Sequence, residues 1–297
     1  MSSNRGQKQF IVLAVIGAIV IVTLTMFIYR QDLRDAYSKW QQGPLPEPVS
    51  AAQARRKPAL VAKDKTIDVI SSGNPMAEQR PTAAPAPSPT PAAAAPVQPP
   101  AAEPAAPTPL PQSFNLKVPM IYQAPLSNWD AVHEDACEEA SMLMVQAFDR
   151  GEESISREVM DRRILDVVDY ENRTLGYFQS TDAATTAGIM TDHLKMAGVK
   201  VLPVASIDDI KRQVADGRPV MLPCSGRDLH NPNFRNGGPV YHMLVVKGWT
   251  AKGIITNDPG TRKGADYVYE PQLLFDAIHD WNGGDVANGA KVMIVAD

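Results

Sequence analysis

The sequence is poor in several residue types that mark common classes of protein. It has only two cysteines in 297 residues, which excludes a disulfide scaffold and a zinc cluster built from thiolates. Aromatic residues make up only 6%, and the net charge of −4 shows no strong excess of either sign. Nucleic acid is therefore not expected as a partner, because its binding proteins usually carry a basic excess. We expect no metal and no cofactor, since neither metal-ligand spacing nor a phosphate-binding glycine loop is present.

Charged residues are also absent from residues 10–29, which read FIVLAVIGAIVIVTLTMFIY. A helix of this length would be about 30 Å long, the thickness of a bilayer's hydrocarbon core. No signal-peptide cleavage site follows, so we expect an uncleaved single-pass anchor in a cell membrane. Basic residues flank the segment almost equally. The short tail of residues 1–9 is more simply kept inside, which favours a C-terminal domain outside the cytoplasm.

Proline is concentrated in one part of the chain. Residues 43–113 hold 17 of the 26 prolines, and residues 81–111 alone hold 12 prolines and 11 alanines. Proline lacks a backbone donor and has a fixed φ, so this composition disfavours helix and sheet and favours extended polyproline II structure. We therefore expect residues 30–113 to form a Pro/Ala-rich disordered stem. A ligand for proline-binding modules is the alternative interpretation.

The remaining residues, 114–297, have the length of one folded domain. Their composition differs from that of the stem: they hold 18 basic and 26 acidic residues, a net charge of −8, against +4 for residues 1–113. An acidic domain favours a cationic peptide over an anionic surface as partner. Apolar runs predict strands, and capping and periodicity predict helices, in an α+β arrangement. The strands are expected near 116–122, 199–204, 219–223, 241–249, 253–258 and 290–296, and the helices near 135–150, 182–197, 206–217 and 271–280.

Cys137 lies at the start of a predicted helix, which Asp135 and Glu138 would cap as a capping box. Unpaired backbone donors and the helix dipole favour a thiolate at this position. The neighbouring acids Asp135, Glu138 and Glu139 oppose it, so a cationic partner would be needed. A buried structural cysteine is the alternative.

His242 and Asp258 are candidate partners for this thiol. His242 begins the apolar strand HMLVVKGW, and Asp258 ends the next strand, GIITND. Two adjacent antiparallel strands of this length would bring the two residues together. The aspartate could then orient the imidazole, as in a nucleophile–base–orienter arrangement. Taken singly, each residue could equally be structural.

In this order the residues resemble the C39-like cysteine peptidase family, in a membrane-anchored bacterial form. The stretches that carry the resemblance cover most of 114–297 and read VPMIYQAP, NWDAVHEDACEEASMLM, LGYFQSTD, GGPVYHMLVVKGW and NDPGTRKG. The family implies a papain-like fold, in which the helix that bears the cysteine packs on an antiparallel sheet. It also implies the reaction, which is hydrolysis of peptide bonds. The partner we expect is therefore a peptide or protein substrate, and a cell-wall peptide is one such substrate.

The resemblance assigns roles to four residues. Cys137 would be the nucleophile, His242 the base and Asp258 the orienting residue, while Gln123 would supply an oxyanion-hole amide. The sequence departs from better-known members at Glu138 and Glu139, where those have Gly and then Pro or Ala. Two other functions stay open: a non-catalytic peptide- or wall-binding module that kept the fold, and a papain-like peptidoglycan amidase or transpeptidase.

Several further residues are weaker candidates. Trp129, Glu138 and Tyr241 are expected to border the substrate cleft, although Trp129 could equally belong to the core. His133 precedes Cys137 by four residues, but its acidic surroundings favour a solvated surface histidine. Cys224 is expected to be a free structural thiol rather than a disulfide partner of Cys137.

Overall fold

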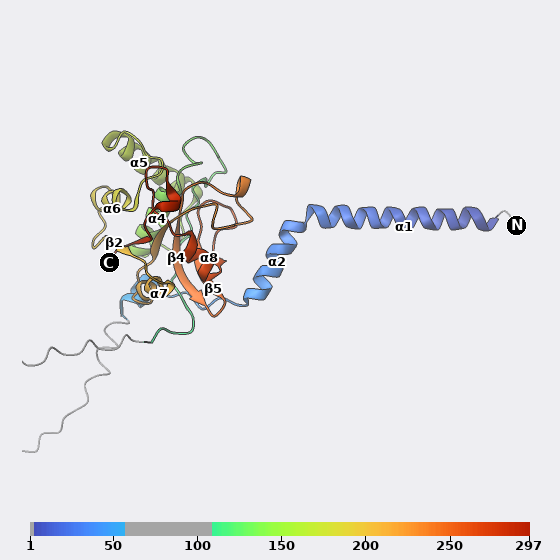
Figure 1. Cartoon of the computed structure of the whole chain (residues 1–297), viewed down its shortest axis with the longest axis horizontal. Helices are drawn as coiled ribbons and strands as arrows, with labels where there is room; N and C mark the ends of the chain where they lie inside the picture. The colour runs from blue at the N-terminus through green and yellow to red at the C-terminus, as the bar shows by residue number, and fades with distance from the viewer. Residues whose placement is uncertain (1–2, 57–108) are drawn as a thin grey trace, which may run out of the picture.

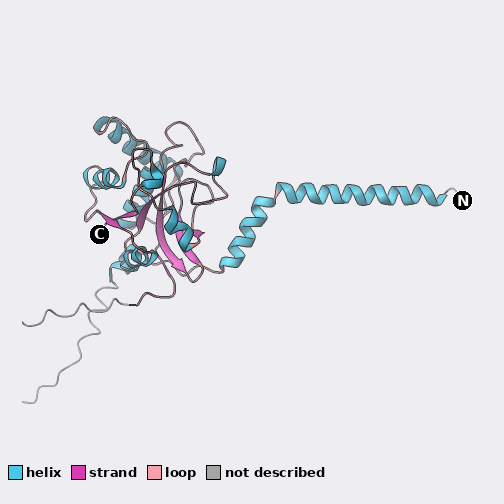
Figure 2. Cartoon of the chain, in the orientation of Figure 1, coloured by secondary structure: helices cyan, strands magenta, loops and turns pink. Residues whose placement is uncertain are grey.

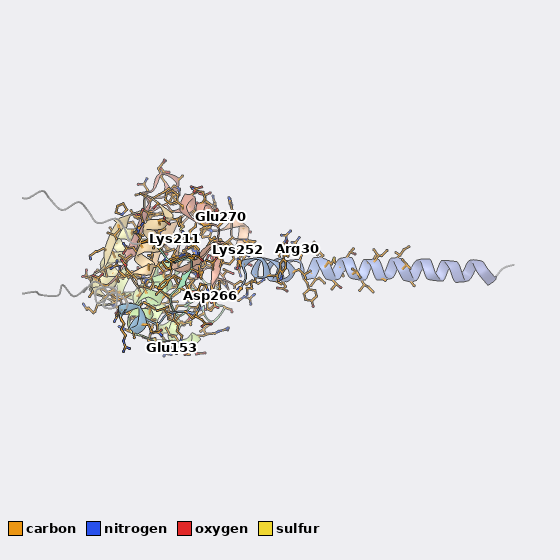
Figure 3. All side chains as sticks on the ribbon, turned by 90° about the horizontal axis from the view of Figure 1, so that it is seen from below. Arg30, Glu153, Lys211, Lys252, Asp266 and Glu270 are labelled. Carbon is orange, nitrogen blue, oxygen red and sulfur yellow. The ribbon has the colours of Figure 1, made fainter. Side chains whose placement is uncertain are left out.

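The computed structural model describes residues 3–56 and 109–297. The N-terminal part is a long helix, α1 (Ser3–Ile28), followed by a shorter helix, α2 (Arg30–Gln42). α1 extends away from the folded domain like a rod, and α2 joins it to the domain at an angle (Figure 1). Arg30 lies at the junction of the two helices (Figure 3), where its guanidinium stacks over the ring of Phe27.

The membrane span predicted for residues 10–29 falls within α1. In the part of the chain that the structure describes, no helix combines the length and the apolar character that a membrane crossing requires.

The chain after α2 packs on the domain instead of beginning a stem. Val49 forms a parallel β-bridge with Leu116, and its backbone N–H and C=O bond to Asn115 and Lys117 at 2.9 and 2.8 Å. Residues 51–56 form a short helix, which buries Ala51 and Ala54 in the core. Residues 49–54 of the predicted stem 30–113 therefore pack on the domain, because small apolar side chains and backbone groups find partners there, whereas residues 30–42 form α2. Most of the predicted polyproline segment, in 57–108, lies outside the described residues.

The domain is built on one antiparallel sheet (Figure 2). Its strand order is β2-β7-β3-β4-β5-β6, and β1 pairs with β4 beside this path. β4 is the central strand, and nearly all of its residues are buried, which explains its long apolar run. The strands are β1 (Phe114–Asn115), β2 (Lys200–Pro203), β3 (Val220–Cys224), β4 (His242–Thr250), β5 (Gly253–Asn257), β6 (Tyr267–Tyr269) and β7 (Val292–Val295).

Gly248 explains how β1 can join the sheet. A Cβ on Gly248 would lie only 2.3 Å from the carbonyl oxygen of Phe114, so a larger residue would displace β1. The pairing of β4 with β5 also shifts register between Val246 and Gly248. The bulge and the absence of a side chain at Gly248 let β4 pair with both β1 and β5 without a steric clash.

Helices pack around the sheet and are capped as their sequences suggest, with one exception. Ser206 and Asp209 form the predicted capping box of α7, and Asp182 caps α6 through the backbone N–H of Thr185. The exception is α4, which has no side-chain cap and is described with the site. The helices are α4 (Cys137–Asp149), α5 (Arg157–Thr174), α6 (Ala183–Asp192), α7 (Ile207–Ala215) and α8 (Pro271–Ala277), with 3-10 turns at Arg235–Gly237 and Val286–Asn288.

Three elements differ from the sequence prediction. Of the strand predicted for 116–122, only Leu116 makes a β-bridge, and residues 117–122 are irregular. The helix α5, with its cap at Ser156, and the short strand β6 were not predicted. The α+β class is confirmed, with an antiparallel sheet and helices around it.

Candidate active site

A single large pocket gathers six of the seven residues singled out in the sequence. Its volume is about 1000 Å³. The segment before α4, the start of α4, the loop before β4 and the loop after β5 all contribute to its walls. The singled-out residues that line it are Gln123, Trp129, Cys137, Glu138, Tyr241 and His242. Asp258 is fully buried behind His242.

Cys137 is the first residue of α4 and is 6% exposed. The predicted capping box is not formed: the N-cap is Ala136, and it makes no side-chain cap. Glu138 cannot cap because its carboxylate turns toward the sulfur, where Oε2 accepts from Sγ at 2.8 Å. The helix is held on the sheet by Ser141, whose hydroxyl donates to the carbonyl of Met243, the residue after His242. The sulfur therefore lies against the start of β4.

The surroundings of Cys137 oppose its ionisation. Burial raises the pKa of the thiol well above its usual value, and the negative charges and hydrogen bond of Glu138 raise it further. A hydrogen bond from the backbone N–H of Met243 lowers the pKa of the thiol, but by a smaller amount. The sequence expectation that neighbouring acids oppose a thiolate is therefore matched by the geometry.

His242 and Asp258 form a buried pair. Nε2 of His242 lies 2.9 Å from Oδ1 of Asp258, and the two side chains are 2% and 0% exposed. This bond fixes the ring orientation and leaves Nδ1 as the nitrogen that can exchange a proton with a group in the pocket. The edge of the Phe234 ring packs against the imidazole, with centroids 5.1 Å apart. A Cβ on Gly260 would lie 2.8 Å from the imidazole, so this position requires glycine.

Asp258 has two further partners that sequence reasoning did not single out. Its Oδ2 accepts hydrogen bonds from the hydroxyl of Tyr269 at 2.6 Å and from the amide of Asn231 at 3.2 Å. Burial alone would raise the pKa of Asp258, but His242, Tyr269 and the backbone N–H of Gly260 together lower it. Tyr269 lies on the unpredicted strand β6, so no sequence signal connected it to Asp258.

Gln123 lies in the pocket wall, but its amide is already engaged. Nε2 donates to the backbone carbonyls of His133 and Glu134 at 2.9 and 3.0 Å. These bonds use both amide hydrogens and hold the turn that leads into α4. An oxyanion role for Gln123 would require one of the two bonds to break, so this role stays a prediction.

The other predicted cleft residues have structural contacts of their own. The hydroxyl of Tyr241 donates to the carbonyl of Thr181 at 3.0 Å, and its ring packs against Trp281. The ring of Trp129 stacks under the guanidinium of Arg235, 5.3 Å from its centroid. The contact joins the segment before α4 to the loop before β4 across the pocket.

The pocket carries charges of both signs. Three acidic residues come from the segment that leads into α4, and three basic residues come from the two loops around His242. They are Glu134, Asp135 and Glu138, and Arg235, Arg262 and Lys263. The acidity of the whole domain therefore does not extend to its pocket, and the expected preference for cationic peptides has no support there.

A group of three buried glutamates lies behind the sulfur. Glu138, Glu139 and Glu171 are each no more than 1% exposed. Burial, with the neighbouring carboxylates, raises the pKa of Glu138 and of Glu171 to about 8 and that of Glu139 well above its usual value. Within the described residues no donor reaches the carboxylate oxygens of Glu139 and Glu171, so a proton shared between them is the available partner. Glu171 lies on the unpredicted helix α5.

His133 is not the surface residue expected from the sequence. It is 2% exposed, and its ring nitrogens lie 2.7 Å from Asp130 and 3.1 Å from Asp161. The acidic neighbours draw the ring inward, because Asp161 approaches from α5. Both cysteines are free, and Cys224 is fully buried opposite His242 on β3, as expected for a structural thiol. In residues 3–56 and 109–297, no group of three or more His, Cys, Asp or Glu forms a candidate metal site.

This arrangement is suited to acyl transfer. A thiol at a helix N-terminus and an oriented histidine face one pocket of about 1000 Å³.

A comparison with models of protein families points in the same direction. Residues 115–282 match the model of the Peptidase_C39 like family. A crystal structure described as that of a putative C39-like peptidase from Bacillus anthracis has 13% identity and a TM-score of 0.38, and the match covers 63% of this chain and 98% of that chain. No curated protein sequence matches the chain.

Proposed function

Because the chain belongs to the C39-like peptidase family, we propose that it is a cysteine peptidase that hydrolyses peptide bonds through Cys137, His242 and Asp258. One observation carries this proposal: the buried His242–Asp258 pair opens on the same pocket as Cys137. The substrate class is a peptide or protein, and a pocket with charges of both signs suits a chain that carries carboxylates as well as amines.

The proposed reaction begins with attack of the Cys137 sulfur on a peptide carbonyl. The backbone N–H of Cys137, at the start of α4, is directed at the developing oxyanion, and one such donor is typically worth about 10²–10³ in rate. Protonated His242 gives its proton to the leaving amine and then activates water against the thioester. Asp258 keeps the ring oriented and stabilises its charged form.

A second function is favoured by one observation, the raised pKa of Cys137. A thiol that stays protonated suits a module that binds peptide or wall fragments without cutting them. A papain-like amidase or transpeptidase would use the same residues as the peptidase, and only its products would differ.

The test is cleavage of a mixed peptide library by the full chain in detergent, with products identified by mass spectrometry. We expect cleavage that Cys137→Ala lowers by at least roughly 10³-fold, because the nucleophile is lost. Cys224→Ala is the matched control, since that thiol is fully buried. An uncleaved library, together with alkylation of Cys137 no faster than that of free cysteine, would favour the binding module.

We also propose that residues 10–29 anchor the chain in a cell membrane, with the domain outside the cytoplasm. The support is the uncharged sequence and the exposure of its apolar side chains, such as Ile21 at 67% and Phe27 at 65%. The full chain should stay with membranes in alkaline carbonate and dissolve in detergent, whereas a chain beginning at residue 44 should be released. Release of both chains by carbonate would refute the anchor.

A further inference from the structure

The contact between Cys137 and Glu138 requires a proton. Their Sγ and Oε2 atoms are 2.8 Å apart, and both side chains are almost fully buried. Two anions at this separation in a buried site would repel each other strongly. One proton must therefore lie between the sulfur and the carboxylate whenever the pair is not fully protonated.

We propose that Glu138 is a further catalytic residue of this peptidase: its protonated carboxyl donates a hydrogen bond to the Cys137 thiolate and so stabilises the nucleophile. The inference rests on the proposed peptidase function and adds to it a partner for the sulfur besides His242. It also assigns a function to Glu138, the acidic residue that directly follows Cys137.

The surroundings of Glu138 favour its protonated form. Its second oxygen, Oε1, meets no hydrogen-bond donor among the described residues, so no partner there stabilises the ion. The pocket also holds His242 and the basic residues Arg235, Arg262 and Lys263, whereas the ionisable groups that pack against Glu138 are acidic or neutral. From its own segment these are Asp135, Cys137 and Glu139, from α5 Glu171, and from the β4 side Tyr241, next to Asp280. Burial and these neighbours raise the pKa of Glu138 to about 8.

The protons balance when Cys137, Glu138 and His242 are counted together. The active state holds two protons on the three groups, one on Glu138 and one on His242. The thiolate forms when the S–H bond breaks and its proton passes to His242, while the sulfur keeps the electron pair. After acylation the leaving amine takes the proton of His242. Hydrolysis then consumes one water, whose proton returns to His242, and it frees the thiolate, still held by Glu138.

The experiment measures the rate of Cys137 alkylation by iodoacetamide against pH in the full chain, with peptide mapping to exclude Cys224. Glu138→Gln keeps a donor to the sulfur but cannot ionise. We expect it to leave the apparent pKa of Cys137 close to that of the first ionisation of the wild-type pair, because in both proteins a neutral donor faces the thiolate. Glu138→Leu keeps neither charge nor donor, and its alkylation at pH 7 should be roughly tenfold slower than that of Glu138→Gln.

Glu139→Leu is the matched control for Glu138→Leu, since Glu139 is the next residue, equally buried, and carries the same group. Its alkylation at pH 7 should slow clearly less than that of Glu138→Leu, because Glu139 does not contact the sulfur. Thermal melts establish that each variant is folded. The wild-type chain gives a second readout without any substitution, because a shared proton makes its alkylation profile follow two ionisations instead of one.

The outcomes separate this inference from the proposed function. Fast alkylation that depends on His242 but is equal in wild type, Glu138→Gln and Glu138→Leu would overturn the role of Glu138 alone. Equal slowing of alkylation by Glu138→Leu and Glu139→Leu would reduce that role to general effects of burial and charge and overturn it as well. A slow Cys137 that is indifferent to His242→Ala would instead refute the peptidase.

Discussion

Replacement of His242 by alanine is expected to lower kcat/KM for peptide cleavage by roughly 10³-fold, since general acid–base catalysis contributes about 10²–10⁴. The loss should exceed that for any other histidine. Its ring is held by Asp258 at 2.9 Å and lines the pocket that contains Cys137. Among the described residues that line this pocket, His242 is the only histidine, so no other imidazole there can give a proton to the leaving amine. The measurement is cleavage of a library-derived peptide, with wild type and variant compared at pH 7.

His193→Ala is the control for this substitution. His193 also lies near an aspartate, Asp166, at 2.9 Å and stacks on Tyr170, but it does not line the pocket. Its loss should leave kcat/KM within about twofold. If His193→Ala and His242→Ala gave equal losses, the effect would come from folding instead of catalysis.

The pH dependence of this pair follows from the lowered pKa of Asp258. A carboxylate whose pKa is lowered by folding stabilises the fold at every pH above its unfolded-state pKa. This contribution is lost only as the pH falls through the folded-state pKa. Asp258 therefore remains ionised at every pH above about 4, and an acid limb of activity above that pH must come from another group.

Replacement of Glu171 by glutamine is expected to stabilise the domain at pH 8.5 and to change little at pH 5. The folded-state pKa of Glu171 is raised from 4.5 to about 8, so the native state binds more protons than the unfolded state between these values. Stability must then fall as the pH rises through this window. Each pKa unit corresponds to about 1.4 kcal/mol, so the gain above pH 8 is on the order of 4 kcal/mol.

Chemical denaturation of the wild type and the variant at both pH values measures this effect. Glu153→Gln is the control, because Glu153 is exposed and pairs with Lys117 at the surface. A wild-type chain that is equally stable at pH 5 and pH 8.5 would contradict the prediction. The substitution should also leave the Cys137–Glu138 contact in place, since the carboxylate oxygens of Glu171 bond to neither residue.

Much of the domain could be read from local patterns. The antiparallel pair β4–β5 was predicted from two apolar runs joined by a short turn, and this pairing brings His242 to Asp258. The start of α7 at Ser206 was predicted from a capping box with Asp209, which acts within one turn of chain. Interactions between residues close in sequence need no knowledge of the rest of the fold.

Other features depended on residues far apart in the chain. Residues 49–54 pack beside 114–117 because the folded sheet offers them a free edge, which their proline-rich context did not suggest. The same is true of His133, which is buried because Asp161 on α5 reaches it. Tyr269 and Asn231 reach Asp258 from two separate segments, and neither has a motif of its own.

The amino-acid sequence by itself determined the family, the α+β class and the residues that could carry the chemistry, because these follow from residue type, order and local spacing. Only the tertiary structure decided their charge state. The helix dipole at Cys137 favours a thiolate, but burial beside Glu138, Glu139 and Glu171 outweighs this effect. The free-energy cost of removing a charged group from water exceeds the stabilisation that one helix N-terminus provides. Such desolvation depends on what packs around a group, and adjacent residues alone do not reveal it.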